Sequence, residues 1–148
     1  MENTIFVLQG RGKIGKTTTI RRIHELICDK FDYERISTSI EKLHTKDITT
    51  IIRVNNINIG IESQGDPNSR LKESLEVFIN SDCKIIICAS RTSGMTVDWI
   101  KNYSDTFKID WIQKTGIENE NEQEQDNEQL AQEVLKKISE LIYKNIEF

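Results

Sequence analysis

The stretch that decides the fold of this chain is Gly10-Arg11-Gly12-Lys13-Ile14-Gly15-Lys16-Thr17, which fits the pattern G-x-x-x-x-G-K-[ST]. Glycines at this spacing let backbone N–H groups turn inward around a chain of phosphate oxygens, because a side chain at those turns would block the approach. Lys16 then supplies a positive charge for the outer phosphates, and Thr17 offers a hydroxyl group to Mg²⁺. The stretch therefore predicts a phosphate-binding loop over Gly10 to Thr18.

The segments on both sides of this loop fit the same interpretation. Residues 4–9 form a short apolar run of β-rich composition, which predicts a buried strand. Ile20, Ile23 and Ile27 follow the loop at helical spacing and predict an amphipathic helix. Such a helix would point the positive end of its dipole at a bound anion.

Two other interpretations use the same glycines. The first is a glycine-rich turn with no ligand. The second is a dinucleotide site, because Gly10, Gly12 and Gly15 also spell G-x-G-x-x-G. A dinucleotide site does not need the Lys16-Thr17 pair, and no acidic residue ends a clear second strand about twenty positions on. Both remain alternatives to a triphosphate site.

The composition predicts one globular domain over residues 1–148. The chain has 148 residues with 36% hydrophobic and 30% charged side chains, which is enough for one core. Its net charge of -4 argues against broad electrostatic binding to nucleic acid. It shows no run of 18 apolar residues and no signal-peptide pattern, so we expect a cytoplasmic protein without a membrane span.

A β-hairpin is expected in the middle of the chain. Residues 47–54 and 57–62 each carry alternating apolar side chains, and Asn55-Asn56 between them tolerates the positive φ angles of a tight turn. The second strand ends at Glu62. A carboxylate at the end of a buried strand is what a magnesium site needs beside Thr17, although a strand-end surface residue would show the same pattern.

The segment after Glu62 contains further candidates. Gly65 would let a backbone N–H group approach the terminal phosphate, and either Gln64 or Asp66 could orient the attacking water. A polar turn that leads into a helix is the simpler alternative for the same residues. That helix is expected over residues 70–80.

A second buried strand is expected over residues 84–89, and it places one more candidate near the loop. Because ligands of open α/β sheets bind at the carboxyl ends of strands, Arg91 would lie near the phosphates. A solvated loop arginine is the alternative. A last strand is expected over residues 107–112.

The composition changes sharply at the end of the chain. Residues 118–129 are almost all Glu, Asn, Gln and Asp, which predicts an acidic flexible loop or linker. Residues 130–146 carry an apolar stripe and predict a C-terminal amphipathic helix, which would dock on the sheet or pair with a partner helix.

These motifs resemble those of the P-loop NTPase superfamily, in which the loop pattern is named Walker A. The resemblance covers roughly residues 1–116 and implies a three-layer α/β sandwich: a mostly parallel sheet, one antiparallel hairpin strand and flanking helices. The hairpin that ends in Glu62-x-x-Gly65 looks like the small-GTPase arrangement with its D-x-x-G turn. By that resemblance Lys16 and Thr17 would hold phosphate and Mg²⁺, Glu62 would hold Mg²⁺ through water, Gly65 would contact the γ-phosphate and Asp66 would position water.

The sequence departs from that arrangement at two places. Glu62 replaces the usual aspartate, and Gln113-Lys114-Thr115-Gly116 stands where a GTPase carries the guanine-reading N-K-x-D. The stretch from Gly12 to Thr18 is also similar to the G-K-T-T loops of the ParA- and MinD-like ATPases, whose early lysine would fall at Arg11. The base therefore stays open.

The function expected is Mg²⁺-dependent binding and hydrolysis of ATP or GTP. Catalysis is assigned to Lys16, Glu62, Gln64, Asp66 and Arg91, and the metal to Thr17 and Glu62. The residues expected to bind the nucleotide are Gly10, Arg11, Gly12, Lys13, Ile14, Gly15, Lys16, Thr17, Thr18 and Gly65.

Two other functions remain open. A small nucleotide or metabolite kinase would need lid arginines, for which Arg70 and Arg91 are candidates. A nucleotide-controlled switch would order Glu41–Asp47 and Gly65–Arg70 and so control a protein partner.

Overall fold

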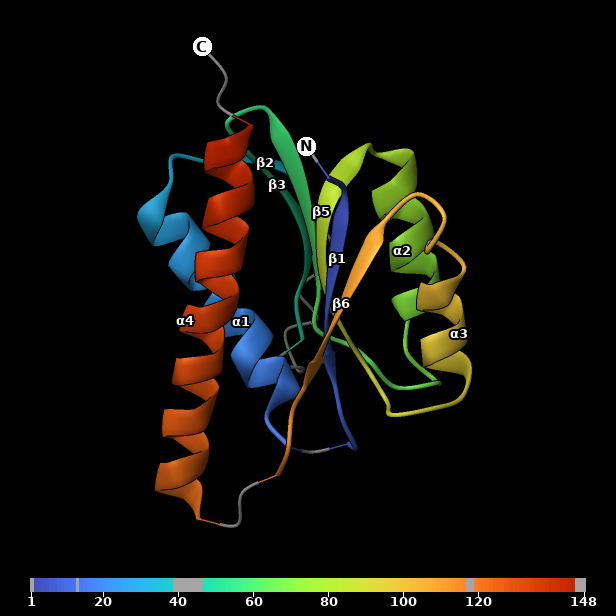
Figure 1. The fold of residues 1–148 in the computed structure, drawn as a ribbon, viewed down its shortest axis with the longest axis vertical. Coiled ribbons are helices and arrows are strands. Elements are labelled where there is room, and N and C mark those ends of the chain that lie inside the picture. The colour runs from blue at the N-terminus through green and yellow to red at the C-terminus, as the bar shows by residue number, and fades with distance from the viewer. Residues whose placement is uncertain (1, 13, 39–46, 117–118, 146–148) are drawn as a thin grey trace.

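The structure is a computed structural model that describes residues 2–12, 14–38, 47–116 and 119–145. Strands and helices alternate along most of the chain (Figure 1). In chain order the elements are β1 (Thr4–Gln9), α1 (Lys16–Lys30), β2 (Glu34–Thr38), β3 (Thr49–Val54), β4 (Ile57–Glu62), α2 (Leu71–Asn80), β5 (Cys83–Ser90), α3 (Met95–Lys101), β6 (Lys108–Gln113) and α4 (Glu120–Lys144).

The sheet has the order β2-β3-β4-β5-β1-β6. The pairs β4–β5, β5–β1 and β1–β6 are parallel, and β3 pairs antiparallel with both β2 and β4. The expected α/β class with a mostly parallel sheet and one antiparallel hairpin strand is therefore confirmed. One strand, β5, lies between β4 and the strand that leads into the glycine loop.

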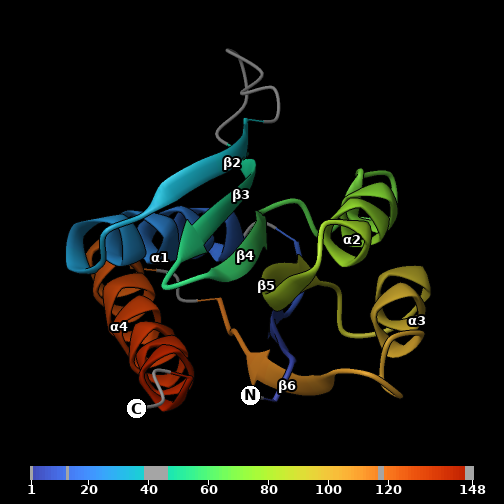
Figure 2. The same cartoon turned by 90° about the horizontal axis from the view of Figure 1, so that it is seen from above.

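Helices cover both faces of the sheet, as expected (Figure 2). On one face, α1 and α4 pack on residues such as Phe6, Leu8 and Ile87. On the other face, α2 and α3 pack on residues such as Ile5 and Val7. Because adjacent residues of β1 serve opposite cores, β1 and β5 read as continuous apolar runs in the sequence.

The hairpin turn follows the predicted chemistry. Asn55 and Asn56 adopt φ angles of 50° and 65°. This two-residue turn sets the register of β3 against β4, with Val54 opposite Ile57 and Thr49 opposite Glu62.

The expectation of an acidic loop over 118–129 is wrong for residues 120–129, which form the first turns of α4. The Asn119 side chain caps this helix, accepting hydrogen bonds from the backbone N–H groups of Asn121 (2.9 Å) and Glu122 (3.2 Å). Glu120 and Glu122 in the first turn also favour the positive end of the helix dipole. Glutamate and glutamine are good helix formers, so their abundance indicated polarity and not disorder.

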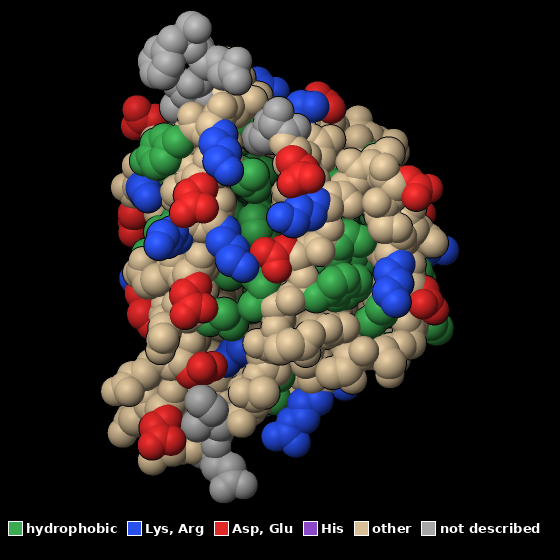
Figure 3. Space-filling model, in the orientation of Figure 1, with side chains coloured by type: hydrophobic (Ala, Val, Ile, Leu, Met, Phe, Trp, Pro, Cys, Tyr) green, Lys and Arg blue, Asp and Glu red, His purple; other side chains and the backbone are tan. Residues whose placement is uncertain are grey.

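The expected C-terminal amphipathic helix is present as the second half of α4, and it docks on α1. Its buried side chains include Ala131, Val134 and Ile138. Figure 3 shows the face that α4 and β6 present, where acidic and basic side chains are interspersed around apolar side chains. Within the described residues, no helix combines the length and the apolar character needed to cross a membrane.

Candidate functional site

The carboxyl ends of β1, β4, β5 and β6 meet at one edge of the sheet, the lower edge in Figure 1. The register pairs Gln9 with both Ser90 and Gln113, so the segments that follow these strands begin side by side. Ligands of open α/β sheets bind at this edge. A cavity of about 420 Å³ lies there.

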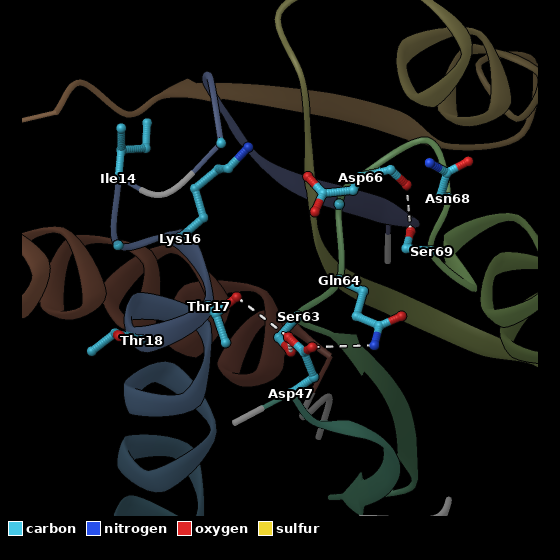
Figure 4. Close-up of a pocket in the computed structure, with 13 residues that line it drawn as sticks. Ile14, Lys16, Thr17, Thr18, Asp47, Ser63, Gln64, Asp66, Asn68 and Ser69 are labelled. Atoms are coloured by element: carbon cyan, nitrogen blue, oxygen red, sulfur yellow. Dashed lines mark hydrogen bonds between the residues drawn. The ribbon is translucent and has the colours of Figure 1, made fainter. Parts of the chain in front are cut away.

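Two chain segments and one further residue line this cavity (Figure 4). Gly12, Ile14 and Gly15 of the glycine loop (residues 10–15) form one wall with the start of α1, and the segment after β4 forms the other. The lining residues are Gly12, Ile14, Gly15, Lys16, Thr17, Thr18, Asp47, Ser63, Gln64, Gly65, Asp66, Asn68 and Ser69. A cavity of this size falls in the range that holds small-molecule ligands.

The Lys16 side chain connects the beginning of the glycine loop to the end of β5. Its ammonium group donates hydrogen bonds to the carbonyl oxygens of Gly10 (2.5 Å) and Ser90 (2.9 Å). The residue is only 7% exposed. The pKa of this amine is lowered from 10.5 to about 8, mainly by burial and also by the nearby positive charge of Arg91, while the negative charge of Asp66 opposes the shift.

The glycine loop turns into α1 at Gly15, which adopts the left-handed conformation with φ 92°. Two features disfavour any side chain at this position. Residues other than glycine rarely adopt the left-handed conformation, and a β carbon would lie 2.7 Å from the side-chain oxygen of Asn127. Thr19 closes the first helical turn by donating its backbone N–H (3.0 Å) and its hydroxyl (2.7 Å) to the Gly15 carbonyl. The first N–H groups of any helix have no partner within the helix, and such groups at the start of a helix are a common binding site for anions.

Thr17 faces Asp47, a residue that the sequence patterns did not single out as a site residue. The Thr17 hydroxyl lies 3.4 Å from Asp47 Oδ1, and the Ser63 hydroxyl donates to the same oxygen at 3.0 Å. Gln64 Nε2 donates to Asp47 Oδ2 at 3.1 Å. Figure 4 shows these side chains converging across the cavity. They form a set of hard oxygen donors of the kind that Mg²⁺ prefers.

Glu62 does not reach the cavity. Its side chain is fully buried, and Oε1 accepts hydrogen bonds from Thr49 Oγ1 (2.7 Å), Ser74 Oγ (2.6 Å) and Arg70 Nε (3.1 Å). Its other oxygen accepts from the backbone N–H of Gln64 at 3.1 Å. All of these partners donate, so the Glu62 carboxylate ties β3, β4 and α2 together. The carboxylate that lines the cavity beside Thr17 is therefore that of Asp47, and not that of Glu62, which was expected to hold Mg²⁺ through water.

Asp66 forms an ion pair with Arg91 at the mouth of the cavity. Arg91 Nε and Nη2 lie 2.9 and 2.8 Å from Asp66 Oδ1. The same guanidinium lies against the glycine loop, because a β carbon on Gly12 would be 2.8 Å from Nη2. Arg91 thus bridges the two walls, although it is not itself in the lining.

Gly65 lies where the second wall passes over the end of β5. A β carbon on Gly65 would be 2.6 Å from the carbonyl carbon of Ala89. This close backbone approach explains the glycine without any ligand, and it also leaves the Gly65 backbone on the cavity surface. Its contact with a γ-phosphate stays a prediction.

The remaining predicted residues divide into three groups. Thr18 and Ile14 line the cavity, although Thr18 points away from Asp47 and Asp66 in Figure 4. Gly10 and Arg11 are not in the lining; Gly10 accepts from Lys16, and Arg11 lies beside Gly116. Lys13, and residues 41–46 of the expected switch segment, lie outside the described residues.

Lys114 lies in the stretch that was compared with the guanine-reading N-K-x-D; its side chain is completely buried and forms an ion pair with Asp126 of α4. It therefore contributes to the support of the site and not to the cavity surface.

Comparisons of the chain with protein-family models, with curated proteins and with solved structures found no match.

Proposed function

We propose that this chain is a P-loop NTPase that binds Mg²⁺ with ATP or GTP and hydrolyses the bond between the β- and γ-phosphates. One observation carries the proposal. The cavity has a buried lysine and a helix start on one wall, and oxygen-rich side chains, Asp47 and Asp66 among them, on the other. Such an arrangement suits an anion held next to a cation and a water molecule.

Phosphate binding would begin with an exchange of partners at Lys16. The ammonium group now donates to two backbone carbonyls, at the ends of β1 and β5. A phosphate oxygen carries a full charge and is therefore a stronger acceptor than a carbonyl group. The backbone N–H groups at the start of α1 would hold the neighbouring oxygens.

A magnesium ion fits the oxygen donors of Thr17, Asp47 and Ser63. Mg²⁺ usually takes one or two carboxylates and completes its six positions with phosphate oxygens and water. Among the described residues no three His, Cys, Asp or Glu side chains gather as a metal site, so the phosphates would have to supply part of the coordination. When bound, the ion would neutralise charge on the β- and γ-phosphates.

Asp66 would position the attacking water. The water oxygen forms a bond to the γ-phosphorus, the bond to the β–γ bridging oxygen breaks, and the Asp66 carboxylate accepts the proton of the water. Asp66 is now paired with Arg91 in an exposed ion pair, with side chains 62% and 39% exposed. Exposed pairs contribute only about 0–1 kcal/mol, so the γ-phosphate could draw Arg91 away at little cost. Gln64 is the second candidate for orienting the water.

The same contacts support nucleotide control of the segment after β4. Gln64 joins Asp47 to the start of α2, because its Nε2 donates to Asp47 and its Oε1 accepts from the backbone N–H of Arg70 at 3.2 Å. A metal ion on Asp47 would change this link and so the order of residues 64–70. Limited proteolysis with and without nucleotide would detect the change, and equal cleavage rates would argue against it.

Transfer of the phosphoryl group to a small acceptor has less support. Of the two arginines expected for a kinase lid, Arg70 is bound to the buried Glu62. The test of hydrolysis is release of inorganic phosphate from ATP and GTP in the presence of Mg²⁺. We expect release by the wild type, and none by Lys16→Ala or in excess EDTA. Turnover that persists in Lys16→Ala, or an absence of turnover in the wild type, would contradict the proposal.

A further inference from the structure

The polar half of α4 contacts the glycine loop at its end. Asn127 is 93% buried, and its amide occupies the space that a side chain on Gly15 would need, with Oδ1 and Nδ2 at 2.7 and 2.9 Å from the position of such a β carbon. Gln123, one turn earlier, donates from Nε2 to Asn127 Oδ1 at 2.9 Å and fixes the amide in this orientation. The left-handed turn at Gly15 therefore packs against an amide group that is itself held by a hydrogen bond.

The residue before Asn127 supports the start of the same loop. Asp126 pairs with the buried ammonium group of Lys114. The Lys114 backbone N–H donates to the Gln9 carbonyl at 2.8 Å, and its own carbonyl lies directly against Gly10. The Lys114–Asp126 pair thus connects the beginning of the loop to α4.

α4 also fixes the helix that follows the loop. Arg22 of α1 donates to both carboxylate oxygens of Glu128, at 2.6 and 3.1 Å, and the apolar side chains of the two helices share one core. Three consecutive residues of α4 therefore support the loop and the helix after it. Asp126 contacts the start of the loop through Lys114, Asn127 contacts the end of the loop at Gly15, and Glu128 contacts α1 through Arg22. Sites for charged ligands depend on such support, because a displacement of about 1 Å at a reacting group can cost about a hundredfold in rate.

We propose that Asp126 and Asn127 are positioning residues of the phosphate site, which hold the glycine loop in the shape that binds a triphosphate. This inference rests on the proposed function. Neither residue lines the cavity, so each acts through another: Asp126 through Lys114, and Asn127 through Gly15. The amide at 127 gives this support without adding a negative charge beside the phosphates.

The test compares four variants with the wild type: Asn127→Ala, Asn127→Asp, Asp126→Asn and the control Glu124→Gln. The control removes one negative charge, as Asp126→Asn does, from an exposed position on the same helix. The dissociation constants of Mg²⁺–ATP and of inorganic triphosphate are measured at low and high salt, at a temperature where the melting curve shows each variant to be folded.

We expect Glu124→Gln to bind like the wild type and Asn127→Ala to bind both ligands at least tenfold more weakly. Asn127→Asp should be weaker still, with a loss that shrinks at high salt because the added charge repels the phosphates. A residue that only stabilised the fold would change the melting temperature without this charge-dependent loss of affinity.

Asp126→Asn leaves the Lys114 ammonium buried without a charged partner, so that variant is also at risk of unfolding. The Asn127 pair keeps the test decisive. Wild-type affinity in Asn127→Ala and Asn127→Asp, in a protein that binds Mg²⁺–ATP, would overturn this inference and leave the proposed function standing. A wild type that binds neither ligand would overturn both.

Discussion

The ammonium group of Lys16 donates a hydrogen bond of 2.9 Å to the carbonyl oxygen of Ser90, at the end of a strand that begins more than sixty residues further along the chain. This contact and the one to Gly10 hold the lysine in a buried position, and burial is the main reason that its pKa is lowered to about 8. The protonated form is the one that binds phosphate. A bound phosphate would raise the pKa, so ligand affinity and protonation are linked.

The affinity for a triphosphate should therefore depend on pH in one direction. The affinity should be highest and nearly constant below pH 8, where Lys16 is already protonated. It should decline by up to about tenfold per pH unit as the pH rises above the Lys16 pKa of about 8. Titrations of Mg²⁺–ATP between pH 6.5 and about 9.5 measure this. Lys16→Arg serves as the control, since its guanidinium stays charged over that range. A flat profile for the wild type would argue against the assigned role of Lys16.

Asp47 and Glu62 should separate metal binding from stability. Asp47→Asn should weaken Mg²⁺–ATP binding about tenfold or more, a change of about 1.4 kcal/mol, because a neutral amide is a poorer ligand of Mg²⁺. Binding in EDTA should not weaken. Glu62→Gln should instead lower the free energy of unfolding by about 1–3 kcal/mol, since it leaves buried donors poorly paired. The reverse pattern, with the metal effect at Glu62, would restore the sequence-based assignment.

Asp66→Asn should reduce turnover without weakening binding. The loss of the proton acceptor should lower kcat by about 10²–10⁴-fold. Removal of a negative charge from the cavity mouth should leave the affinity for Mg²⁺–ATP equal or higher. Single-turnover rates and dissociation constants test this, with Asp105→Asn as a matched exposed control outside the cavity. Unchanged turnover in Asp66→Asn would transfer the role to Gln64 or to another group.

ATP and GTP should bind with affinities within about tenfold of each other. The described lining of the cavity contains no aromatic ring on which a base could stack, and Lys114 is committed to Asp126. Most contacts available to the ligand therefore go to its phosphates. Competition between the two nucleotides measures the ratio, and a preference of a hundredfold or more would show that the base is recognised.

Local chemistry predicted the parts of this fold that depend on neighbouring residues. Asn55-Asn56 between two alternating runs was enough for the hairpin, because the turn type follows from residues that tolerate positive φ. The glycine spacing and the flanking apolar runs likewise predicted the strand, loop and helix from Thr4 to Lys30.

The position of Glu62 depends on a non-local property, the order of strands in the sheet. Because β5 lies between β4 and β1, the ends of β4 and β1 are about 10 Å apart, two strand spacings. No residue pattern within β4 or β1 indicates that β5 lies between them. One signal for Asp47 was present: a two-residue turn at 55–56 with Thr49 opposite Glu62 also sets Asp47 near Gln64, on the wall after β4.

The prediction of an acidic loop over residues 118–129 is wrong for residues 120–129, the start of α4, for a related reason. Its composition is that of a solvated segment, but its contacts are specific: Asp126 meets Lys114, Asn127 meets Gly15 and Glu128 meets Arg22. Gly15 and Arg22 lie more than a hundred residues away in the sequence, and Lys114 lies outside the helix, on the segment after β6. Composition reports the average polarity of a segment, whereas these contacts depend on which face of the helix each residue occupies.

We propose that the cavity binds a nucleoside triphosphate with Mg²⁺ through Lys16. Calorimetric titration of the purified wild type and of Lys16→Ala with ATP in the presence of Mg²⁺ tests it most directly. We expect one site per chain in the wild type and a loss of at least a hundredfold in affinity in a folded Lys16→Ala variant. Equal affinities in the two proteins would contradict this proposal, and so would a wild type that shows no binding at millimolar nucleotide by calorimetry or by a second method.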